Sequence, residues 1–300
     1  MILGCIADDV TGGTDLALTL ASTGLRVVQI LGDDDVSPPA DVDAVVIALK
    51  VRTAPREEAV AAAQSAARKL LDWGVHQLYF KYCSTFDSTA EGNIGPIAEA
   101  LARLVKASIV PVCPAFPANG RTVYQGYLFV YDQVLSDSPM KDHPLTPMRE
   151  SNLKALLQPQ LSPSAKVDHV PLKTIEEGAG AIQRAVAALG TEETRFVVLD
   201  AIQDHHLIEI CRAFADAPLL TGGSALGLGL IDNYIEAGLL QGQRAPLAFP
   251  VHDGPVAILS GSCSAASQEQ VRRAAAHTEV IELDPLALLL TDGDPRSVVE

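Results

Sequence analysis

Two adjacent aspartates, Asp8 and Asp9, follow the apolar run Ile2–Ala7 and lead into a Val-Thr-Gly-Gly turn. Carboxylates at this place suit hydroxyl groups, Mg²⁺, or a proton taken from an attacking alcohol. The alternative is structural: one aspartate caps the following helix and its neighbour is solvated. A cap needs only one acid, however, and two are present. We expect Asp8 and Asp9 to be catalytic and substrate-binding, with Thr11 beside them.

A second polar segment begins at Lys81, the last residue of the predicted strand Gln77–Lys81. A lysine beside several hydroxyls and an acid predicts a pocket for a polyhydroxy acid. The ammonium would pair with the carboxylate while Ser and Thr contact hydroxyl groups. The alternative is a surface lysine that extends its charge into water. The substrate-binding candidates of this segment are Lys81, Ser84, Thr85, Asp87 and Asn93.

Three further basic side chains are substrate-binding candidates. Arg52 follows the predicted strand Ala44–Ala48, and Arg121 lies in an Asn-Gly-Arg-Thr segment. His143 lies in a loop, where it could bind a ligand or act as an acid or base. For each, a solvated surface cation is the competing interpretation.

Turns of small residues before predicted helices recur twice more along the chain. Such turns expose backbone N–H groups, and the helix dipole adds partial positive charge, so anions bind there. Capping of the following helix is the competing explanation. We expect these turns to bind a nucleotide through Gly222, Gly223, Ser224, Ser260, Gly261, Ser262 and Ser264.

Short apolar runs alternate with alanine-rich helical periods, which is typical of a mostly parallel sheet with helices on both faces. The fold class is therefore α/β, and ligands should bind beyond the carboxyl ends of the strands. Strands are predicted at Ile2–Ala7, Arg26–Leu31, Ala44–Ala48, Gln77–Lys81, Ser108–Val112, Lys166–Val170, Arg195–Leu199, Pro218–Thr221, Pro255–Leu259 and Val280–Leu283. Helices are predicted at Thr14–Ser22, Arg56–Trp73, Ile94–Leu104, Ile175–Leu189, Asp204–Phe214, Ala225–Ala237 and Ala265–His277.

The length of 300 residues favours two domains. We expect an α/β domain at residues 1–240, a Pro- and Gly-containing linker at 241–254, and the start of a second, incomplete α/β domain at 255–300. Between Cys113 and Arg149 the α/β pattern breaks, but its aromatic residues argue against disorder. This stretch is predicted to be an ordered excursion that faces the substrate or another subunit.

Composition excludes several classes of protein. The net charge of −15 gives no general attraction for nucleic acid or an anionic membrane. No apolar run approaches the roughly 20 residues that span a bilayer, and the N-terminus lacks the features of a signal peptide, so a cytoplasmic protein is expected. Five widely spaced cysteines predict reduced thiols and no zinc site or other metal cluster.

Motifs of three enzyme classes are missing from the sequence. It holds no P-loop, no dinucleotide fingerprint after the first strand, and no nucleophile elbow.

Several ordered segments together resemble the four-carbon acid sugar kinases. The resemblance runs from the first strand to the turn at Ser260–Ser264. It rests on the segments Ile6–Gly12, Tyr79–Thr89, Gly92–Pro96, Cys113–Pro117, Asn119–Gly126, His143–Met148, Thr221–Ser224 and Leu259–Ser264. Departures are small: Val10 replaces an expected Phe and Gly13 an expected Ala, and neither carries a polar group.

The resemblance implies a sugar-acid-binding N-terminal domain, a C-terminal nucleotide domain and reaction between them. It implies transfer of phosphate from ATP, with Mg²⁺ on the ATP phosphates, to the terminal 4-hydroxyl of 3-dehydrotetronate. The segments Ala7–Gly12 and Lys81–Thr89 would hold the acid, and Ser260–Ser264 would contact ATP. The family continues for roughly another third beyond the motifs found here, so the nucleotide half is expected to be incomplete.

Two other functions stay open on the sequence. One is a sugar-acid-binding module without catalytic activity, because the second domain is incomplete. The other is a dehydrogenase acting on sugar acids, against which the missing dinucleotide fingerprint counts. The expected partners are the sugar acid and ATP, and an acidic chain with an aromatic excursion is compatible with a homodimer.

Overall fold

The structure is a computed structural model that describes residues 1–32, 36–37, 40–143, 145–240, 253–261 and 265–284. The chain divides into two compact units, Met1–Ala248 and Phe249–Glu300. Each is described by itself.

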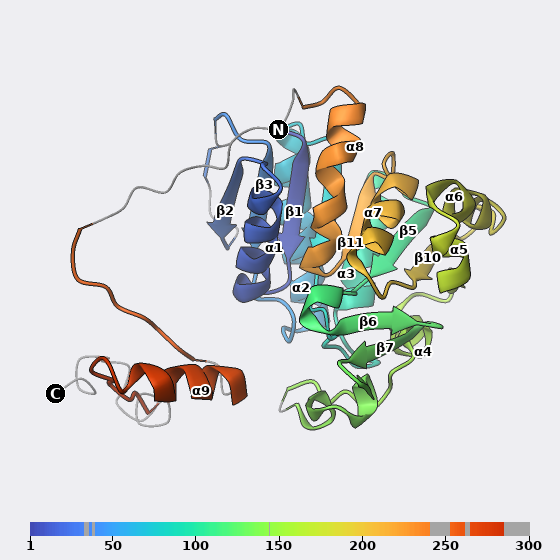
Figure 1. Cartoon of the computed structure of the whole chain (residues 1–300). Coiled ribbons are helices and arrows are strands. Elements are labelled where there is room, and N and C mark those ends of the chain that lie inside the picture. The colour runs from blue at the N-terminus through green and yellow to red at the C-terminus, as the bar shows by residue number, and fades with distance from the viewer. Residues whose placement is uncertain (33–35, 38–39, 144, 241–252, 262–264, 285–300) are drawn as a thin grey trace. The chain divides into compact units, whose positions relative to one another are not determined.

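The first unit is built on an eight-stranded sheet in which every neighbouring pair of strands is parallel (Figure 1). Its order is β2-β3-β1-β4-β11-β5-β10-β9. The strands are β1 Leu3–Ala7, β2 Val27–Leu31, β3 Ala44–Ala48, β4 Gln77–Lys81, β5 Ile109–Cys113, β9 Ala165–Val170, β10 Thr194–Leu199 and β11 Leu219–Gly222. The predicted α/β class is confirmed, and each of these strands was predicted to within one residue at either end.

Helices cover both faces of this sheet, which is why its central strands are buried and largely apolar. Every residue of β1, β3 and β4 is buried. In Figure 1, α1 and α8 lie in front of the sheet and α2 and α3 behind it. The helices of this unit are α1 Val10–Ser22, α2 Arg56–Asp72, α3 Ile94–Val105, α4 Leu153–Leu157, α5 Leu172–Glu176, α6 Ala179–Ala187, α7 Asp204–Ala213 and α8 Leu230–Glu236.

The strand order creates a topological switch point at β1. From β1 the chain runs to β2 and β3 on one side, then crosses β1 to reach β4 on the other side. Where connections leave in opposite directions, a crevice opens beyond the carboxyl ends of the strands, and ligands bind there. This rule therefore predicts a ligand site beyond Ala7 and Lys81, the last residues of β1 and β4.

The excursion after β5 is ordered, as predicted, but it contains strands that the sequence analysis missed. A small antiparallel sheet is formed by β6 Arg121–Tyr124, β7 Tyr127–Val130 and β8 Gln133–Val134. Gln125 and Gly126 join β6 to β7 with φ values of 54° and 74°, as a two-residue hairpin turn requires. Buried Asp200 accepts hydrogen bonds from both turn N–H groups, at 2.8 and 2.9 Å, which fixes the hairpin to the main sheet.

Two predicted helices are divided in the structure. Ile175–Leu189 was predicted as one helix, but α5 and α6 are separated at Gly178, whose φ of 88° no helix accommodates. Ala225–Ala237 was also predicted as one helix. Its first part is a 3₁₀ helix, Ser224–Gly229, and α8 follows. Gly229 packs so closely that a Cβ there would lie 2.8 Å from the Cβ of Cys211.

In the second unit, α9 (Ala265–Ala274) confirms a predicted helix. The strands predicted at Pro255–Leu259 and Val280–Leu283 are wrong, because both segments are described without strand pairing. Val256, Ile258 and Leu259 are more than four-fifths exposed. An extended segment becomes a strand only when a neighbour accepts and donates its backbone hydrogen bonds, and the described residues supply none here.

Candidate functional site

The carboxyl ends of three neighbouring strands carry the polar residues of the candidate site. Asp8 and Asp9 follow β1, Arg52 follows β3, and Lys81 ends β4. The backbone joins these ends: Asp8 N donates to Lys81 O at 3.0 Å, and Val51 N and Arg52 N donate to Asp8 O at 3.0 and 3.2 Å. These residues therefore meet at the carboxyl edge of the sheet, where ligands are expected to bind.

Arg52 is the centre of the cluster. Its Nε and one terminal nitrogen each donate to a different oxygen of Asp8, both at 2.9 Å. The same terminal nitrogen lies 3.0 Å from Asp9 Oδ1, and the other lies 3.4 Å from Asp87 Oδ2. One guanidinium thus holds three carboxylates, so it is mostly committed within the protein.

Asp8 and Asp9 differ in what remains available to a ligand. The side chain of Asp8 is 3% exposed and both its oxygens accept from Arg52. Burial raises the pKa of Asp8, while the hydrogen bonds and charge of Arg52 lower it. The side chain of Asp9 is 31% exposed, and its Oδ1 accepts from Gly12 N at 2.8 Å as the N-cap of α1. Among the described contacts none involves Oδ2 of Asp9, so this oxygen is free to accept a hydrogen bond from a ligand.

Lys81 is buried, with 3% of the residue exposed, and carries its charge to the start of α1. Its Nζ donates to Tyr82 O at 2.9 Å. An ammonium has three N–H groups, and this is the one acceptor found for them among the described contacts. A Cβ on Gly12 would lie 2.9 Å from this Nζ and would also clash with Asp9. Glycine is required at this position because the ammonium and the N-cap carboxylate occupy that space.

The segment after β4 adds hydroxyl and thiol groups. Thr85 Oγ1 donates to Asp87 Oδ1 at 2.5 Å and lies 2.9 Å from Cys83 Sγ. Thr85 and Asp87 are buried, whereas Ser84 and Cys83 are partly exposed. Burial, and next the charge of Asp87, raise the pKa of Cys83 to about 11. Cys83 is therefore a neutral thiol at the edge of the site.

Alkylation of Cys83 is expected to be slow. With a pKa of about 11, its thiolate fraction at pH 7.5 is roughly 100-fold below that of an ordinary cysteine, and the thiolate is the reacting species. Peptide-resolved mass spectrometry of iodoacetamide-treated protein measures the rate. A rate equal to that of a free cysteine peptide would show that Cys83 is not held as a neutral thiol.

Three predicted site residues have other tasks in the structure. Asn93 donates from Nδ2 to Val51 O and Ala54 O at 2.7 and 2.8 Å, so it positions the Arg52 loop. Arg121 lies over the ring of Tyr131, 5.5 Å from its centroid. His143 Nδ1 accepts from Thr146 N at 3.1 Å. No described contact joins Arg121 or His143 to the cluster, and Thr11 lies exposed in the first turn of α1.

The turn Gly222–Ser224 lies beside the cluster, because Gly222 pairs with Lys81 in the ladder between β11 and β4. Its small residues have a packing explanation. A Cβ on Gly222 would clash with Cys113 O, and one on Gly223 would lie 2.7 Å from Pro114 O. The buried Ser224 hydroxyl donates to Asp15. A nucleotide at this turn stays a prediction.

The other predicted nucleotide residues belong to the second unit. Ser260 and Gly261 are described as exposed chain without a helix or strand. Ser262 and Ser264 lie outside the described residues.

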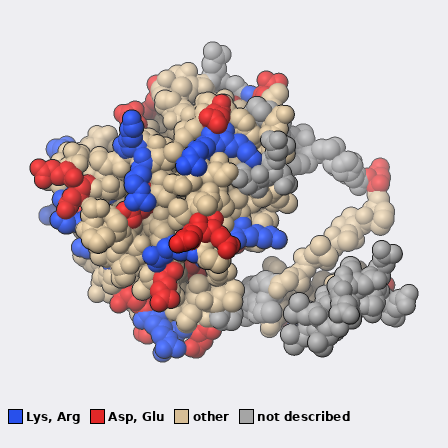
Figure 2. Space-filling model, turned by 180° about the vertical axis from the view of Figure 1, so that it is seen from behind, with Lys and Arg blue, Asp and Glu red and all other residues tan. Residues whose placement is uncertain are grey.

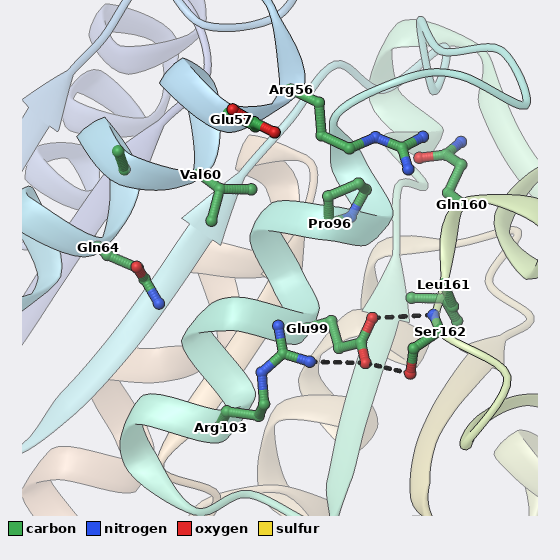
Figure 3. Close-up of a pocket in the computed structure, with 11 residues that line it drawn as sticks. Arg56, Glu57, Val60, Gln64, Pro96, Glu99, Arg103, Gln160, Leu161 and Ser162 are labelled. Atoms are coloured by element: carbon green, nitrogen blue, oxygen red, sulfur yellow. Dashed lines mark hydrogen bonds and ion pairs between the residues drawn. The ribbon is translucent and has the colours of Figure 1, made fainter.

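A cavity of about 510 Å³ lies away from the cluster, between α2, α3 and the segment 160–162 (Figure 3). Its buried acid is already paired: Glu99 accepts from Arg103 at 2.8 Å, from Ser162 N at 3.0 Å and from the Ser162 hydroxyl at 2.5 Å. Figure 2, which views the molecule from behind, shows acidic and basic side chains intermingled rather than one basic patch. Gln160, in the cavity wall, was missed in the sequence because its partners are some 65 and 72 positions away.

The described residues do not form a metal centre. No group of three or more His, Cys, Asp or Glu side chains among them could hold a metal ion. The three carboxylates that do meet are held by Arg52. The four described cysteines, Cys5, Cys83, Cys113 and Cys211, are free thiols. No helix in the described part of the chain is long and apolar enough to cross a membrane.

A parallel α/β sheet with a polar cluster at its switch point defines an α/β ligand-binding domain whose site carries both acids and cations. The model of the sugar-binding N-terminal domain matches residues 3–230. The chain therefore belongs to the family of that domain, and the resemblance predicted from the motifs is confirmed by relatives named 3-oxo-tetronate kinase.

Three relatives illustrate the similarity. A 3-oxo-tetronate kinase of Cupriavidus necator is 45% identical over 96% of this chain and 67% of its own length. A crystal structure from Salmonella typhimurium is 42% identical with a TM-score of 0.83, over 94% of this chain and 66% of that one. A domain of unknown function from Bordetella bronchiseptica, a domain-swapped dimer with bound citrate, is 28% identical with a TM-score of 0.63, over 79% of this chain and 57% of that one. The chain spans about two thirds of the length of the curated relatives it matches.

Proposed function

We propose that this chain is the sugar-acid-binding part of an ATP-dependent kinase that phosphorylates 3-oxo-tetronate (3-dehydrotetronate) at its terminal 4-hydroxyl. The observation that carries the proposal is the buried ammonium of Lys81, with one described acceptor, beside acids at the switch point of the sheet. Such a group favours an anionic ligand, because a buried charge is stable only when it is paired. Relatives named 3-oxo-tetronate kinase support the choice of acid.

The geometry suggests a separate role for each residue. Lys81 binds the substrate carboxylate, supported by the positive end of α1, which begins at Val10. Asp9 accepts a hydrogen bond from a substrate hydroxyl through Oδ2, and at the reacting hydroxyl this oxygen would take the proton as the general base. Arg52 is a positioning residue, since Asp8, Asp9 and Asp87 already use most of its N–H groups.

When bound, ATP supplies the phosphoryl group and Mg²⁺ neutralises its phosphates. Among the described residues no group of three or more His, Cys, Asp or Glu side chains could hold a metal ion, and Gly222 and Gly223 have a packing explanation, so contact of ATP with this turn stays a prediction. The acid-binding cluster itself would bind and orient the acid and accept its proton.

Calorimetric titration tests the proposal. We expect the 300-residue chain to bind 3-oxo-tetronate when the acid is added alone. Separate titration with Mg·ATP distinguishes the kinase from the noncatalytic module: binding of both ligands supports a kinase with a usable nucleotide site, and binding of the acid alone supports the module. Absence of acid binding would contradict the site assignment.

A homodimer stays a prediction for this chain. The Bordetella bronchiseptica relative crystallised as a domain-swapped dimer, which is compatible with it.

A further inference from the structure

The helix α3 begins without help from its own N-cap side chain. Asparagine is among the residue types that normally cap a helix by accepting a first-turn N–H bond, yet Asn93 makes no such bond. Its Nδ2 donates instead to Val51 O and Ala54 O, which ties the start of α3 to the loop carrying Arg52. The free N–H groups at the start of α3 therefore need another acceptor.

Gln160 supplies that acceptor from 65 positions further along the chain. Its Oε1 accepts from Gly95 N at 2.8 Å, and its Nε2 donates to Ser88 Oγ and to Leu156 O, both at 3.0 Å. The residue is 3% exposed and both ends of its amide are used. Ser88 directly follows Asp87, whose carboxylate meets Arg52 and Thr85. Gln160 does not contact the cluster itself. It contacts Ser88, the residue next to Asp87 in the chain.

The packing around this amide is tight. A Cβ on Gly95 would lie 2.5 Å from the Cβ of Gln160, and a Cβ on Gly92 would clash with the Ser88 hydroxyl. Both glycines of the Gly-Asn-Ile-Gly segment are therefore required by Gln160 and Ser88. The segment is shaped to receive the amide.

We infer that Gln160 is a positioning residue of the sugar-acid site. It holds Ser88, and through it Asp87, where the Asp87 carboxylate meets Arg52, while Asn93 holds the Arg52 loop against the same helix start. The expected effect of Gln160 on the affinity for the sugar acid rests on the proposed function. The structural part of the inference, that Gln160 holds residues 84–95 in place, can be measured without any ligand.

The test compares Gln160→Met with Gln158→Met. Methionine keeps the length of glutamine and removes its hydrogen bonds. Gln158 lies in the same turn and also makes two bonds, to Ala165 O and from Val167 N, both at 3.0 Å, but these fix β9 rather than the site. In calorimetry with 3-oxo-tetronate we expect Q160M to bind about tenfold more weakly, the net effect of about one of the three hydrogen bonds that the amide loses, and Q158M within about twofold of the parent.

Hydrogen exchange of the ligand-free proteins is the second measurement. Amides of residues 84–95 are expected to exchange faster in Q160M than in the parent or Q158M, because the amide no longer holds Ser88 and the start of α3. Should Q160M fail to fold, Ser88→Ala replaces it, because this variant removes one acceptor of the same amide. It is expected to weaken acid binding and to speed exchange at residues 84–95, but by less than Q160M.

Each outcome decides the inference. Parent-like affinity in Q160M, or equal losses in Q160M and Q158M, would overturn it. If the parent chain binds no 3-oxo-tetronate, the proposed function fails, and the exchange of residues 84–95 alone decides the positioning role. Unchanged exchange there would then refute it.

Discussion

Arg52→Ala is expected to lose about 3 kcal/mol of the free energy of unfolding together with detectable sugar-acid binding. Asp8 is 3% exposed and both its oxygens accept from Arg52. Removing one partner of a buried ion pair leaves an uncompensated charge, which costs about 3–5 kcal/mol. The lower end is expected because the Arg52 side chain is 21% exposed. Binding is lost because Asp9 and Asp87 lose the cation that orients them.

Urea unfolding followed by tryptophan fluorescence measures the stability effect. Trp73 is the only tryptophan of the sequence and follows α2 in the first unit, so the signal reports on the unit that holds the site. The matched control is Arg103→Ala: Arg103 also pairs with an acid, Glu99 at 2.8 Å, but is 62% exposed, and about 1 kcal/mol or less is expected. Equal losses in the two variants would contradict the central role of Arg52.

A double variant separates charge from packing. Arg52→Met with Asp8→Asn removes both charges, so its stability should exceed that of Arg52→Ala, since of the two buried carboxylates that Arg52 holds only Asp87 is left without its cation. Its affinity for the acid should stay low because Asp9 and Asp87 are still not oriented. A double variant less stable than Arg52→Ala would show that the pair itself, rather than the orphaned charge, decides the loss.

The main sheet could be predicted because its central strands are buried on both faces. The continuous apolar run Ala44–Ala48 and the apolar centre of Gln77–Lys81 indicate these strands directly. The places of Asp8 and Lys81 followed from the rule that parallel strands end at one edge. The strand order, which makes β1 the switch point, is not written in any local segment, because it depends on long-range pairing.

The parts that could not be predicted depend on distant partners. Arg52 was predicted as a ligand for the substrate, but its geometry commits it to three carboxylates from β1 and the segment after β4. Asn93 was predicted as a substrate ligand, but its amide holds backbone carbonyls about 40 positions earlier. The strands of the small sheet were missed, although the Gln125-Gly126 turn between short apolar runs is a hairpin signal.

Lys81→Met is expected to weaken binding of 3-oxo-tetronate by about 100-fold while the free energy of unfolding changes by less than about 1 kcal/mol. The ammonium is buried with one described acceptor, Tyr82 O. Its charge therefore adds little to the stability of the fold, and a methionine of similar length should fill the same space. A charge-assisted bond to a carboxylate is worth about 1.5–3 kcal/mol, or roughly 10- to 100-fold in affinity, and the buried setting favours the upper end.

Both variants are expected to lose affinity, but only Arg52→Ala is expected to lose stability, and this difference makes the prediction decisive. Loss of affinity with stability retained identifies Lys81 as a group kept for the ligand, since a residue kept for folding would lower both. Calorimetry with 3-oxo-tetronate and urea unfolding of the same samples give the two values. Lys166→Met is the control, because Lys166 is 54% exposed and pairs with Glu193 at 2.6 Å on the surface, and its affinity should match the parent. Parent-like affinity in Lys81→Met would place the substrate carboxylate elsewhere and remove the observation on which the proposed function depends.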